Sequence, residues 1–178
     1  MNGGRRVLVT TASKHGSTHE IAAALARYLP ATRAGSQIGM TAFAIPVDND
    51  PDPASFDAIV LGSAVYVGRW LEQARNFAFG HTEVLRRRPV WLLSSGPIGE
   101  PPFPPDEPHD AEPIGSILGV RGHRVFPGRL DKSLLTFGER AMVTAMRAPV
   151  GDFRDWDLLR AWAEEIAVDV AGAATPSL

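Results

Sequence analysis

The sequence predicts an α/β domain in which a doubly wound, five-stranded parallel sheet lies between two helical layers, a three-layer arrangement. Short, almost continuously apolar runs indicate strands that are covered on both faces. Stretches in which apolar residues recur every three or four positions alternate with these runs and indicate helices. Because such alternation forms right-handed βαβ units, we expect a single domain over 1–178.

The first predicted strand, 5–11, is short, aliphatic and β-branched, which is typical of a central parallel strand. A helix follows it, because Ile21, Leu25 and Leu29 share one face at helical spacing. We expect Pro30 to end this helix.

The middle of the chain contains three more predicted strands. Residues 34–45 are weakly strand-like, and the proline-rich connection over 46–57 excludes regular strand pairing. A buried strand covers 58–66, and a helix follows over 71–88 until a proline ends it. The apolar run 90–95 is the next buried strand.

The last part of the chain predicts a long loop, a fifth strand and three helices. The segment 99–113 is too rich in proline for a helix or an interior strand and too long for a turn. A short helix over 114–120 and an apolar strand over 123–130 follow. Residues 132–149 have the spacing of an extra helix inserted before the last one, which Asp155 caps.

Composition and charge narrow the classes of function. Cysteine is absent, which excludes disulfides, thiolate metal sites and cysteine nucleophiles, and the five histidines show no metal-ligand spacing. The net charge of −2 favours neither a nucleic acid partner nor the acidity of a small carrier that docks on basic proteins. Residues 1–6 are polar and no apolar run approaches membrane-spanning length, so we expect a cytoplasmic protein.

Three loops follow strands at the edge of the sheet where a ligand is expected. In doubly wound sheets the ligand lies outside the carboxyl ends of the strands, where the strand order reverses. The loops at that edge are 11–19, 62–70 and 94–103. We therefore expect the binding residues to lie within these three segments.

The first loop contains SKHGST at 13–18 and has the composition of an anion site. A helix amino terminus presents unpaired N–H groups and the positive end of the helix dipole. Ser13, Ser17 and Thr18 add hydroxyl groups, and Gly16 lets the backbone approach a ligand closely. Because neither G-x-x-x-x-G-K-[ST] nor G-x-G-x-x-G is present, we expect a monophosphate. A role for these hydroxyls as helix caps alone remains open at this point.

The second loop carries an aromatic ring that suits a flat ligand. Tyr66 stands among small residues in AVYVG at 64–68, and Gly68 permits backbone conformations that other residues resist. A flat ring next to a monophosphate site indicates flavin mononucleotide, FMN.

Three loop sequences occur in order along the chain: SKHGST at 13–18, AVYVG at 64–68 and SSG at 94–96. Together they resemble the flavodoxin-like family, whose first loop reads roughly T/S-x-T-G-x-T. The whole chain is similar to the branch described as menaquinone-dependent protoporphyrinogen dehydrogenase, in which an S-T-R-D-G-Q-T-like loop occupies the same place. The resemblance includes the final helix, in GDFRDWDLLRAWAEEIA from 151. It implies an FMN-dependent oxidoreductase with a role in heme biosynthesis.

The resemblance also implies roles for the residues of the three loops. The flavin phosphate is expected to contact six consecutive residues of the first loop: Ser13, Lys14, His15, Gly16, Ser17 and Thr18. The two sides of the flavin ring are expected to contact residues of the other loops: Val65, Tyr66, Val67, Gly68, Ser94, Ser95, Gly96 and Pro97. His15 departs from the family's common Thr or Asp, and we expect its backbone N–H to be the useful group. For Trp70 we favour packing over flavin contact.

The function that the resemblance implies is oxidation of protoporphyrinogen IX or a similar reduced compound through the flavin, with a quinone as electron acceptor. Between 62 and 99 the acidic residues are Glu72 and Glu83, both in the predicted helix, so the pocket favours a higher-potential enzyme. No catalytic side chain is assigned. An electron carrier that docks on a redox partner protein and a flavin-free interaction domain remain alternatives.

Two segments outside the loops are candidates for substrate or partner choice. The loop 99–113 is typical of a lid or a partner-docking segment. The segment 132–149 combines apolar residues with basic flanks, which is compatible with peripheral membrane contact or with a homo-oligomer interface. We favour packing of this helix on its own domain, because stripes of Met and Leu are usually core.

Overall fold

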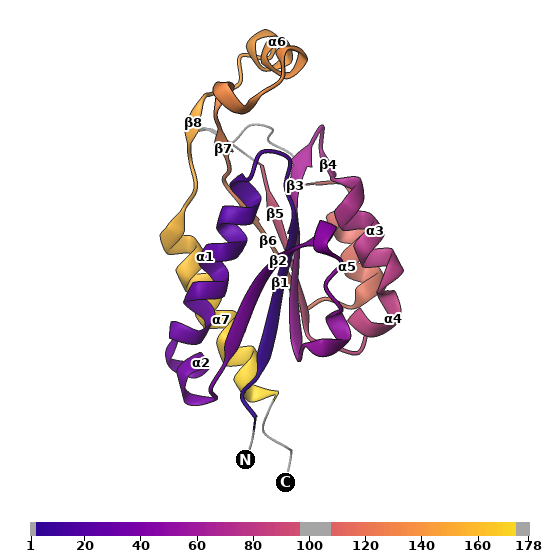
Figure 1. The fold of residues 1–178 in the computed structure, drawn as a ribbon, viewed down its shortest axis with the longest axis vertical. Coiled ribbons are helices and arrows are strands. Elements are labelled where there is room, and N and C mark those ends of the chain that lie inside the picture. The colour runs from indigo at the N-terminus through magenta and orange to yellow at the C-terminus, as the bar shows by residue number, and fades with distance from the viewer. Residues whose placement is uncertain (1–2, 97–107, 174–178) are drawn as a thin grey trace.

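The structure is a computed structural model that describes residues 3–96 and 108–173. Its main sheet contains five parallel strands in the order β2-β1-β3-β5-β6 (Figure 1). The strands are β1 Arg6–Ala12, β2 Thr41–Pro46, β3 Ala58–Tyr66, β5 Val90–Ser95 and β6 Gly122–Phe126. A short strand, β4 Arg69–Trp70, pairs antiparallel with the end of β3. The predicted fold class is confirmed.

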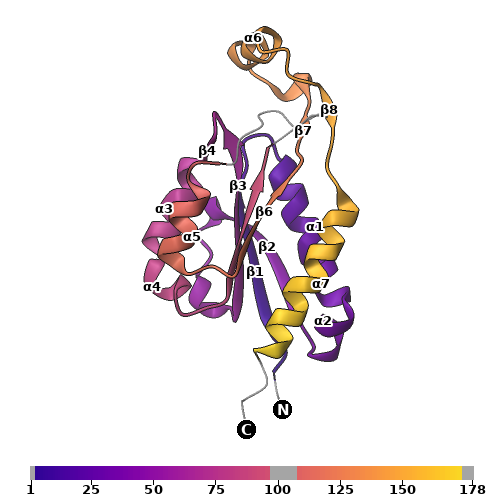
Figure 2. The same cartoon turned by 180° about the vertical axis from the view of Figure 1, so that it is seen from behind.

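Helices cover both faces of the sheet and make three layers (Figures 1 and 2). One face carries α1 Ser17–Ala31, α2 Arg33–Gln37 and α7 Trp156–Gly172, and the other carries α3 Glu72–Gly80, α4 Thr82–Leu85 and α5 Ala111–Leu118. Val7 and Val9 of β1 pack in the core under α1 and α7, whereas Leu8 packs under α3 and α5. Because all three side chains are fully buried, β1 is a continuous apolar run in the sequence.

The first third of the chain differs from the prediction at two places. α1 includes Pro30 in its last turn and ends one residue later, because a proline there forfeits few backbone hydrogen bonds. The Thr32 hydroxyl accepts a hydrogen bond from the Gly35 N–H at 2.9 Å and starts α2. Residues 34–37, for which the sequence predicts the start of a weak strand, are therefore helical, and β2 begins only at Thr41.

The middle of the chain follows the prediction with one break. The connection over 46–57 contains two short 3-10 helices, η1 Val47–Asn49 and η2 Pro53–Ser55. The helix predicted over 71–88 is two helices, α3 and α4. The Thr82 hydroxyl donates to two carbonyls in the last turn of α3, at 3.0 Å each, and these bonds end α3 before α4 begins.

α5 begins earlier than the sequence predicts. It starts at Ala111, so the end of the loop predicted over 99–113 is helical. Residues 99–107 of that loop lie outside the described residues. Pro113 is tolerated because it lies in the first turn of α5, where backbone N–H groups have no helical partner in any case.

An insertion follows β6, where the sequence predicts a strand that continues to residue 130. Instead, two short strands, β7 Arg129–Leu130 and β8 Gly151–Asp152, pair as an antiparallel ribbon outside the main sheet. Between them lie a 3-10 helix, η3 Lys132–Leu134, and α6 Phe137–Ala145. The insertion extends beyond the carboxyl edge of the sheet (Figures 1 and 2).

α6 has no buried residue along its length. Phe137 is 87% exposed, and Met142 and Met146 are half exposed. The expectation that this helix packs on the core of its own domain is therefore wrong. The physical reason is the ribbon of β7 and β8, which carries α6 past the ends of α1 and of the sheet, beyond both core layers (Figure 1).

An ion-pair network anchors the ribbon to α1. Glu20, in the first turn of α1, accepts hydrogen bonds from Arg129 at 3.1 and 3.3 Å and also from Arg154. The guanidinium of Arg154 is only 7% exposed and donates to Asp152 of β8 at 2.6 and 2.8 Å. Hydrogen bonds from Arg154 lower the pKa of both Glu20 and Asp152 below the ordinary carboxyl range.

We predict that Arg154→Gln lowers the free energy of unfolding near neutral pH by about 1–2 kcal/mol, because two carboxylates lose charge-assisted hydrogen bonds. Because the folded protein lowers the pKa of these carboxyl groups, they contribute their full stabilisation at a pH above the pKa of the same groups in the unfolded chain, about 4. This contribution is lost as the pH falls through their pKa in the folded protein. Urea unfolding from about pH 6 to about pH 3 should show the difference from the parent shrinking.

The matched control is Arg87→Gln, which removes a guanidinium from an exposed pair with Glu83 and should cost less than about 0.5 kcal/mol. A cost for Arg154→Gln that does not change with pH would contradict the electrostatic account of the network.

Candidate functional site

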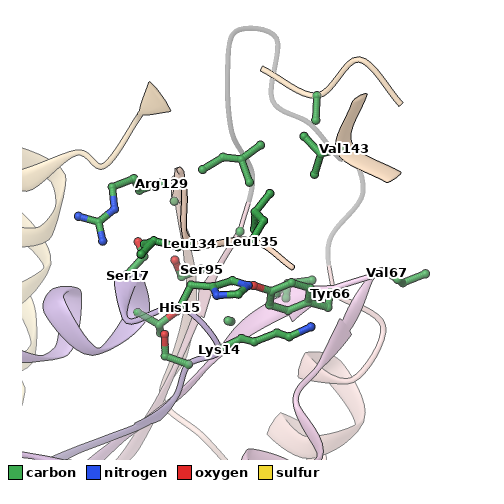
Figure 3. A pocket seen from close by; sticks show the side chains of 18 of the residues that line it. Lys14, His15, Ser17, Tyr66, Val67, Ser95, Arg129, Leu134, Leu135 and Val143 are labelled. Atoms are coloured by element: carbon green, nitrogen blue, oxygen red, sulfur yellow. The ribbon is translucent and has the colours of Figure 1, made fainter. Parts of the chain in front are cut away.

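Three loops and the insertion enclose a cavity of about 480 Å³ at the carboxyl edge of the sheet (Figure 3). The loops follow β1, β3 and β5, at the edge that the doubly wound topology predicts. Most of the predicted site residues line the cavity: Ser13, Lys14, His15, Ser17, Thr18, Val65, Tyr66, Val67, Gly68, Ser95 and Gly96. Gly16 and Ser94 do not line it, and Pro97 lies outside the described residues.

The first loop turns into α1 at Gly16, whose φ of +86° lies in the left-handed region that favours glycine. The Gly16 N–H donates to the Ser13 hydroxyl at 3.0 Å and closes the loop. The first helical bond runs from the Glu20 N–H to the Gly16 carbonyl at 3.0 Å, so the N–H groups before Glu20 have no partner in the helix. Gly16 therefore contributes the turn that presents these donors.

Two hydroxyl side chains of the first turn of α1 line the cavity. Thr18 is buried, and the Oγ of Ser17 is also buried, with no hydrogen-bond partner among the described residues. No side chain caps α1, so a capping role does not explain these hydroxyls. A buried, unpaired hydroxyl costs about 1–3 kcal/mol, so one on a cavity wall is well placed to bind a polar ligand atom. Beside the positive end of the helix dipole, that atom is best an anion's oxygen.

Lys14 and His15 contact a carboxylate that the sequence analysis does not single out, that of Glu139 in α6. Lys14 Nζ forms an ion pair with Glu139 Oε1, and His15 Nε2 lies 3.3 Å from the same oxygen. The hydrogen bond from Lys14 lowers the pKa of Glu139 to about 2, so this carboxylate is anionic at neutral pH. Glu139 thereby joins the insertion to the first loop, which we call the floor of the cavity.

Tyr66 lies beside the same pair of basic residues (Figure 3). Lys14 Nζ is 5.3 Å from the centroid of the Tyr66 ring, and the His15 ring meets it edge-on with centroids 6.4 Å apart. Burial, and then the charge of Glu139, raises the pKa of Tyr66 to about 12. Tyr66 is therefore a neutral phenol at physiological pH.

The second loop is a tight hairpin between β3 and β4. Val67 and Gly68 form its two-residue turn, with φ of +50° and +71°, the pattern of a type I′ turn. Val67 is β-branched, and a β-branched residue adopts positive φ only with backbone strain. Its side chain is 86% exposed, so side-chain burial does not offset that strain. The Gly68 carbonyl accepts the His109 N–H at 2.8 Å, and His109 also lines the cavity, although the sequence analysis does not identify it.

The third loop brings Ser95 and Gly96 to the cavity wall. The Gly96 N–H donates to the Phe126 carbonyl at 3.3 Å. A Cβ on Gly96 would lie 3.1 Å from the Cβ of Val65, so the second and third loops approach at a distance that favours glycine.

Ser94 is buried away from the cavity. Its hydroxyl accepts the Trp70 indole N–H at 2.8 Å and lies 2.8 Å from His123 Nε2. Ser94 and Trp70 therefore hold β5 against the second loop, and Trp70 packs as the sequence analysis favours. We do not include Ser94 among the proposed ligand contacts.

The insertion supplies the remaining wall of the cavity, which we call the roof and define as residues 129–148. The apolar residues of the roof that line the cavity are Leu130, Leu134, Leu135, Met142, Val143, Met146 and Ala148. Figure 3 shows Leu134, Leu135 and Val143 across the cavity from Lys14. The charged roof residues on the cavity have partners in the protein, since Arg129 binds Glu20 and Asp131 accepts hydrogen bonds from Ser133.

The helix terminus that suits an anion lies beside an aromatic ring and an apolar wall, at the edge of the sheet where doubly wound folds bind their ligands. Residues 8–157 match the family model described as flavodoxin domain. The chain belongs to the flavodoxin domain family. A comparison with curated proteins finds no match.

Solved structures share the fold at low sequence identity. An oxidoreductase from Corynebacterium diphtheriae has a TM-score of 0.61 and 14% identity, with 97% of this chain and 99% of that chain covered. A flavodoxin, WrbA-like protein from Agrobacterium tumefaciens has a TM-score of 0.56 and 13% identity, with 97% and 100% covered. Rubredoxin oxygen:oxidoreductase from Desulfovibrio gigas has a TM-score of 0.60 and 13% identity over 96% of this chain, which spans 37% of that protein's length. These likenesses concern the fold.

We predict that Val67→Asn raises the free energy of unfolding of the cofactor-free protein by about 1 kcal/mol, because Asn adopts positive φ more readily than a β-branched residue. Urea unfolding measures the change. Val150→Asn replaces a half-exposed valine outside the left-handed region, and this control should not gain stability. A Val67→Asn protein no more stable than its parent would show that the turn is not strained.

Proposed function

We propose that this chain binds FMN in the cavity at the carboxyl edge of the sheet. The observation that carries the proposal is the buried Ser17 hydroxyl, which has no hydrogen-bond partner among the described residues. It lies beside the N–H groups at the start of α1 that have no partner in the helix. These donors fit the oxygens of a phosphate monoester. Membership of the flavodoxin domain family supports a flavin as the rest of the ligand.

The three loops would divide FMN between them. Residues of the first loop would hold the phosphate, with Gly16 shaping the turn: Ser13, Lys14, His15, Ser17 and Thr18. Residues of the second and third loops would hold the flavin ring: Val65, Tyr66, Val67, Gly68, Ser95 and Gly96. Pro97 stays in the proposal on the strength of the family resemblance.

Bound FMN would supply reversible hydride and electron transfer, and the protein would set its orientation and surroundings. Tyr66 stays neutral because its pKa is raised to about 12, so it adds no negative charge beside the ring. The Glu139 carboxylate is compensated by Lys14 and His15. A site with an unpaired carboxylate would destabilise a reduced, anionic flavin by charge repulsion, and this site does so less. The arrangement therefore supports a higher redox potential for the bound flavin.

We infer an oxidoreductase with a substrate of its own. The roof supports this inference, because it gives the cavity an apolar wall on which a small compound can pack. Protoporphyrinogen IX or a similar reduced compound is the proposed electron donor, on the basis of the family resemblance. A quinone is the proposed acceptor, which takes up two electrons and two protons to become a hydroquinone.

An electron carrier of the flavodoxin type is the second candidate. Such a protein passes electrons to a partner protein, and the exposed side chains of Val67 and Phe137 favour a contact surface near the cavity. The net charge of −2 weighs against a strongly acidic carrier.

We propose a single domain over 1–178 that works in the cytoplasm and makes peripheral contact with the inner face of the membrane, where an apolar quinone would reside. The exposed apolar residues of α6 and the basic residues Arg140 and Arg147 support such a contact. None of the helices within 3–96 and 108–173 combines the length and apolar composition needed to cross a bilayer.

We predict that the flavin-stripped protein binds added FMN with quenching of flavin fluorescence, and that Ser17→Ala weakens binding about tenfold by removing one hydrogen bond to the phosphate. Ser36→Ala is the matched control, because Ser36 is an exposed serine of α2 at the other end of the domain (Figure 1). Its affinity should equal that of the parent.

No binding at micromolar FMN would contradict the proposal and would favour a flavin-free interaction domain. Binding that Ser17→Ala leaves unchanged would place the phosphate away from the start of α1.

A further inference from the structure

Glu139 occupies an unusual place for a residue of α6. The helix around it has no buried residue, yet the Glu139 side chain is only 13% exposed. Its carboxylate contacts Lys14 and His15 in the loop after β1, two residues that line the cavity. Within the described residues, the hydrogen bonds and ion pairs of α6 outside its own insertion are those of Glu139.

The two carboxylate oxygens of Glu139 have separate partners. Oε2 accepts the Thr136 N–H at 2.8 Å, and the Thr136 hydroxyl accepts the Glu139 N–H at 3.3 Å, a capping box that starts α6. Oε1 meets Lys14 and His15. One side chain thus fixes the start of the helix and ties that start to the first loop.

The contact of Glu139 with Lys14 and His15 also affects the charge that the cavity presents to a ligand. Lys14 and His15 face a carboxylate of their own chain, and Arg129 and Asp131 are also paired within the protein. Lys14 and Arg129 thus have anionic partners within the protein, and the apolar residues Leu134, Leu135 and Val143 of the roof lie across the cavity from Lys14 (Figure 3). Leu134, Met142 and Met146 are about half exposed and have apolar surface left to cover.

We propose that Glu139 is the positioning residue that holds α6 over the cavity, and that the covered cavity admits a small, uncharged, apolar electron acceptor of the quinone class and excludes a protein acceptor. The part about the substrate rests on the proposed function, whereas the part about Glu139 concerns the protein without a cofactor. The apolar roof favours an apolar acceptor over an ionic one on the side of the cavity away from the first loop. The insertion also extends beyond the carboxyl edge of the sheet, so a protein that approaches from that side meets the insertion before the cavity (Figures 1 and 2).

The first test uses the cofactor-free protein and measures amide hydrogen exchange in α6. Glu139→Gln keeps a side-chain oxygen for the capping box but removes the charge that binds Lys14 and His15. Exchange in α6 should become faster by about tenfold, because the helix loses its tie to the first loop. Glu165→Gln makes the same change in an exposed pair with Arg124 and should leave exchange in α6 unchanged.

A double-mutant cycle separates the ion pair from helix capping, because Lys14→Met leaves the capping box of Glu139 intact. Lys14→Met should speed exchange in α6, and the double variant with Glu139→Gln should exchange no faster than Glu139→Gln alone, since both changes break the same contact. Unchanged exchange in both single variants, or additive effects in the double variant, would overturn the positioning role of Glu139.

The second test uses the FMN-loaded protein after chemical reduction and compares two electron acceptors. One reduced flavin gives two electrons and two protons to one molecule of 2-methyl-1,4-naphthoquinone, forming its hydroquinone, or one electron to each of two molecules of cytochrome c. The reduced parent should react with the quinone at least about a hundredfold faster than with cytochrome c. Glu139→Gln should lower this ratio of the two rates at least about fivefold, because it exposes the flavin to the protein acceptor.

The outcomes separate the inference from the proposed function. A parent that binds FMN but reduces cytochrome c as fast as the quinone would overturn the substrate part of the inference, and the proposed FMN site would stand. Failure to bind FMN would overturn the proposed function and the substrate part together, while the exchange experiment would still decide the role of Glu139.

Discussion

The packing of α1 against β1 constrains everything at the carboxyl edge of the sheet. Leu25 and Leu29 of α1 and Val7 and Val9 of β1 are fully buried in one core. Because a short loop over 13–16 joins the strand to the helix, the amino terminus of α1 must lie beside the end of β1. The unpaired N–H groups of the helix, its dipole and its first hydroxyls therefore meet at the edge where the doubly wound sheet places its ligand.

The same turn of α1 also supports the insertion. Glu20 binds Arg129 of β7 and also Arg154, which follows β8 by two residues, so the base of the roof is fixed to the helix that presents the anion site. Glu139 adds a second link, from the far part of the insertion to the loop before α1. The geometry of the roof and the geometry of the first loop are thus coupled, which makes the covered cavity a property of the whole edge and not of α6 alone.

Much of this edge is predictable from sequence, and the exceptions have physical causes. The buried strands could be identified because side chains on both of their faces are apolar, and the loops then followed from topology. Ser94 was assigned to the flavin together with Ser95 on the family resemblance, but neighbouring residues of a strand point to opposite faces of the sheet, and Ser94 is buried away from the cavity. The stripe of α6 has the same spacing whether it faces a core or a cavity. The Glu139 contact spans 124 residues and leaves no local signal beyond the Thr136 capping box.

The start of α1 is proposed to hold the phosphate of a flavin nucleotide, and a comparison of two ligands decides whether it does. The affinities of the flavin-stripped protein are measured for FMN and for riboflavin, which has the same ring without the phosphate. We expect FMN to bind at least about a hundredfold more tightly, because a phosphate gains several charge-assisted hydrogen bonds at the helix terminus. Equal affinities for the two flavins would rule out a phosphate site at α1, because the first loop would then contribute nothing to binding.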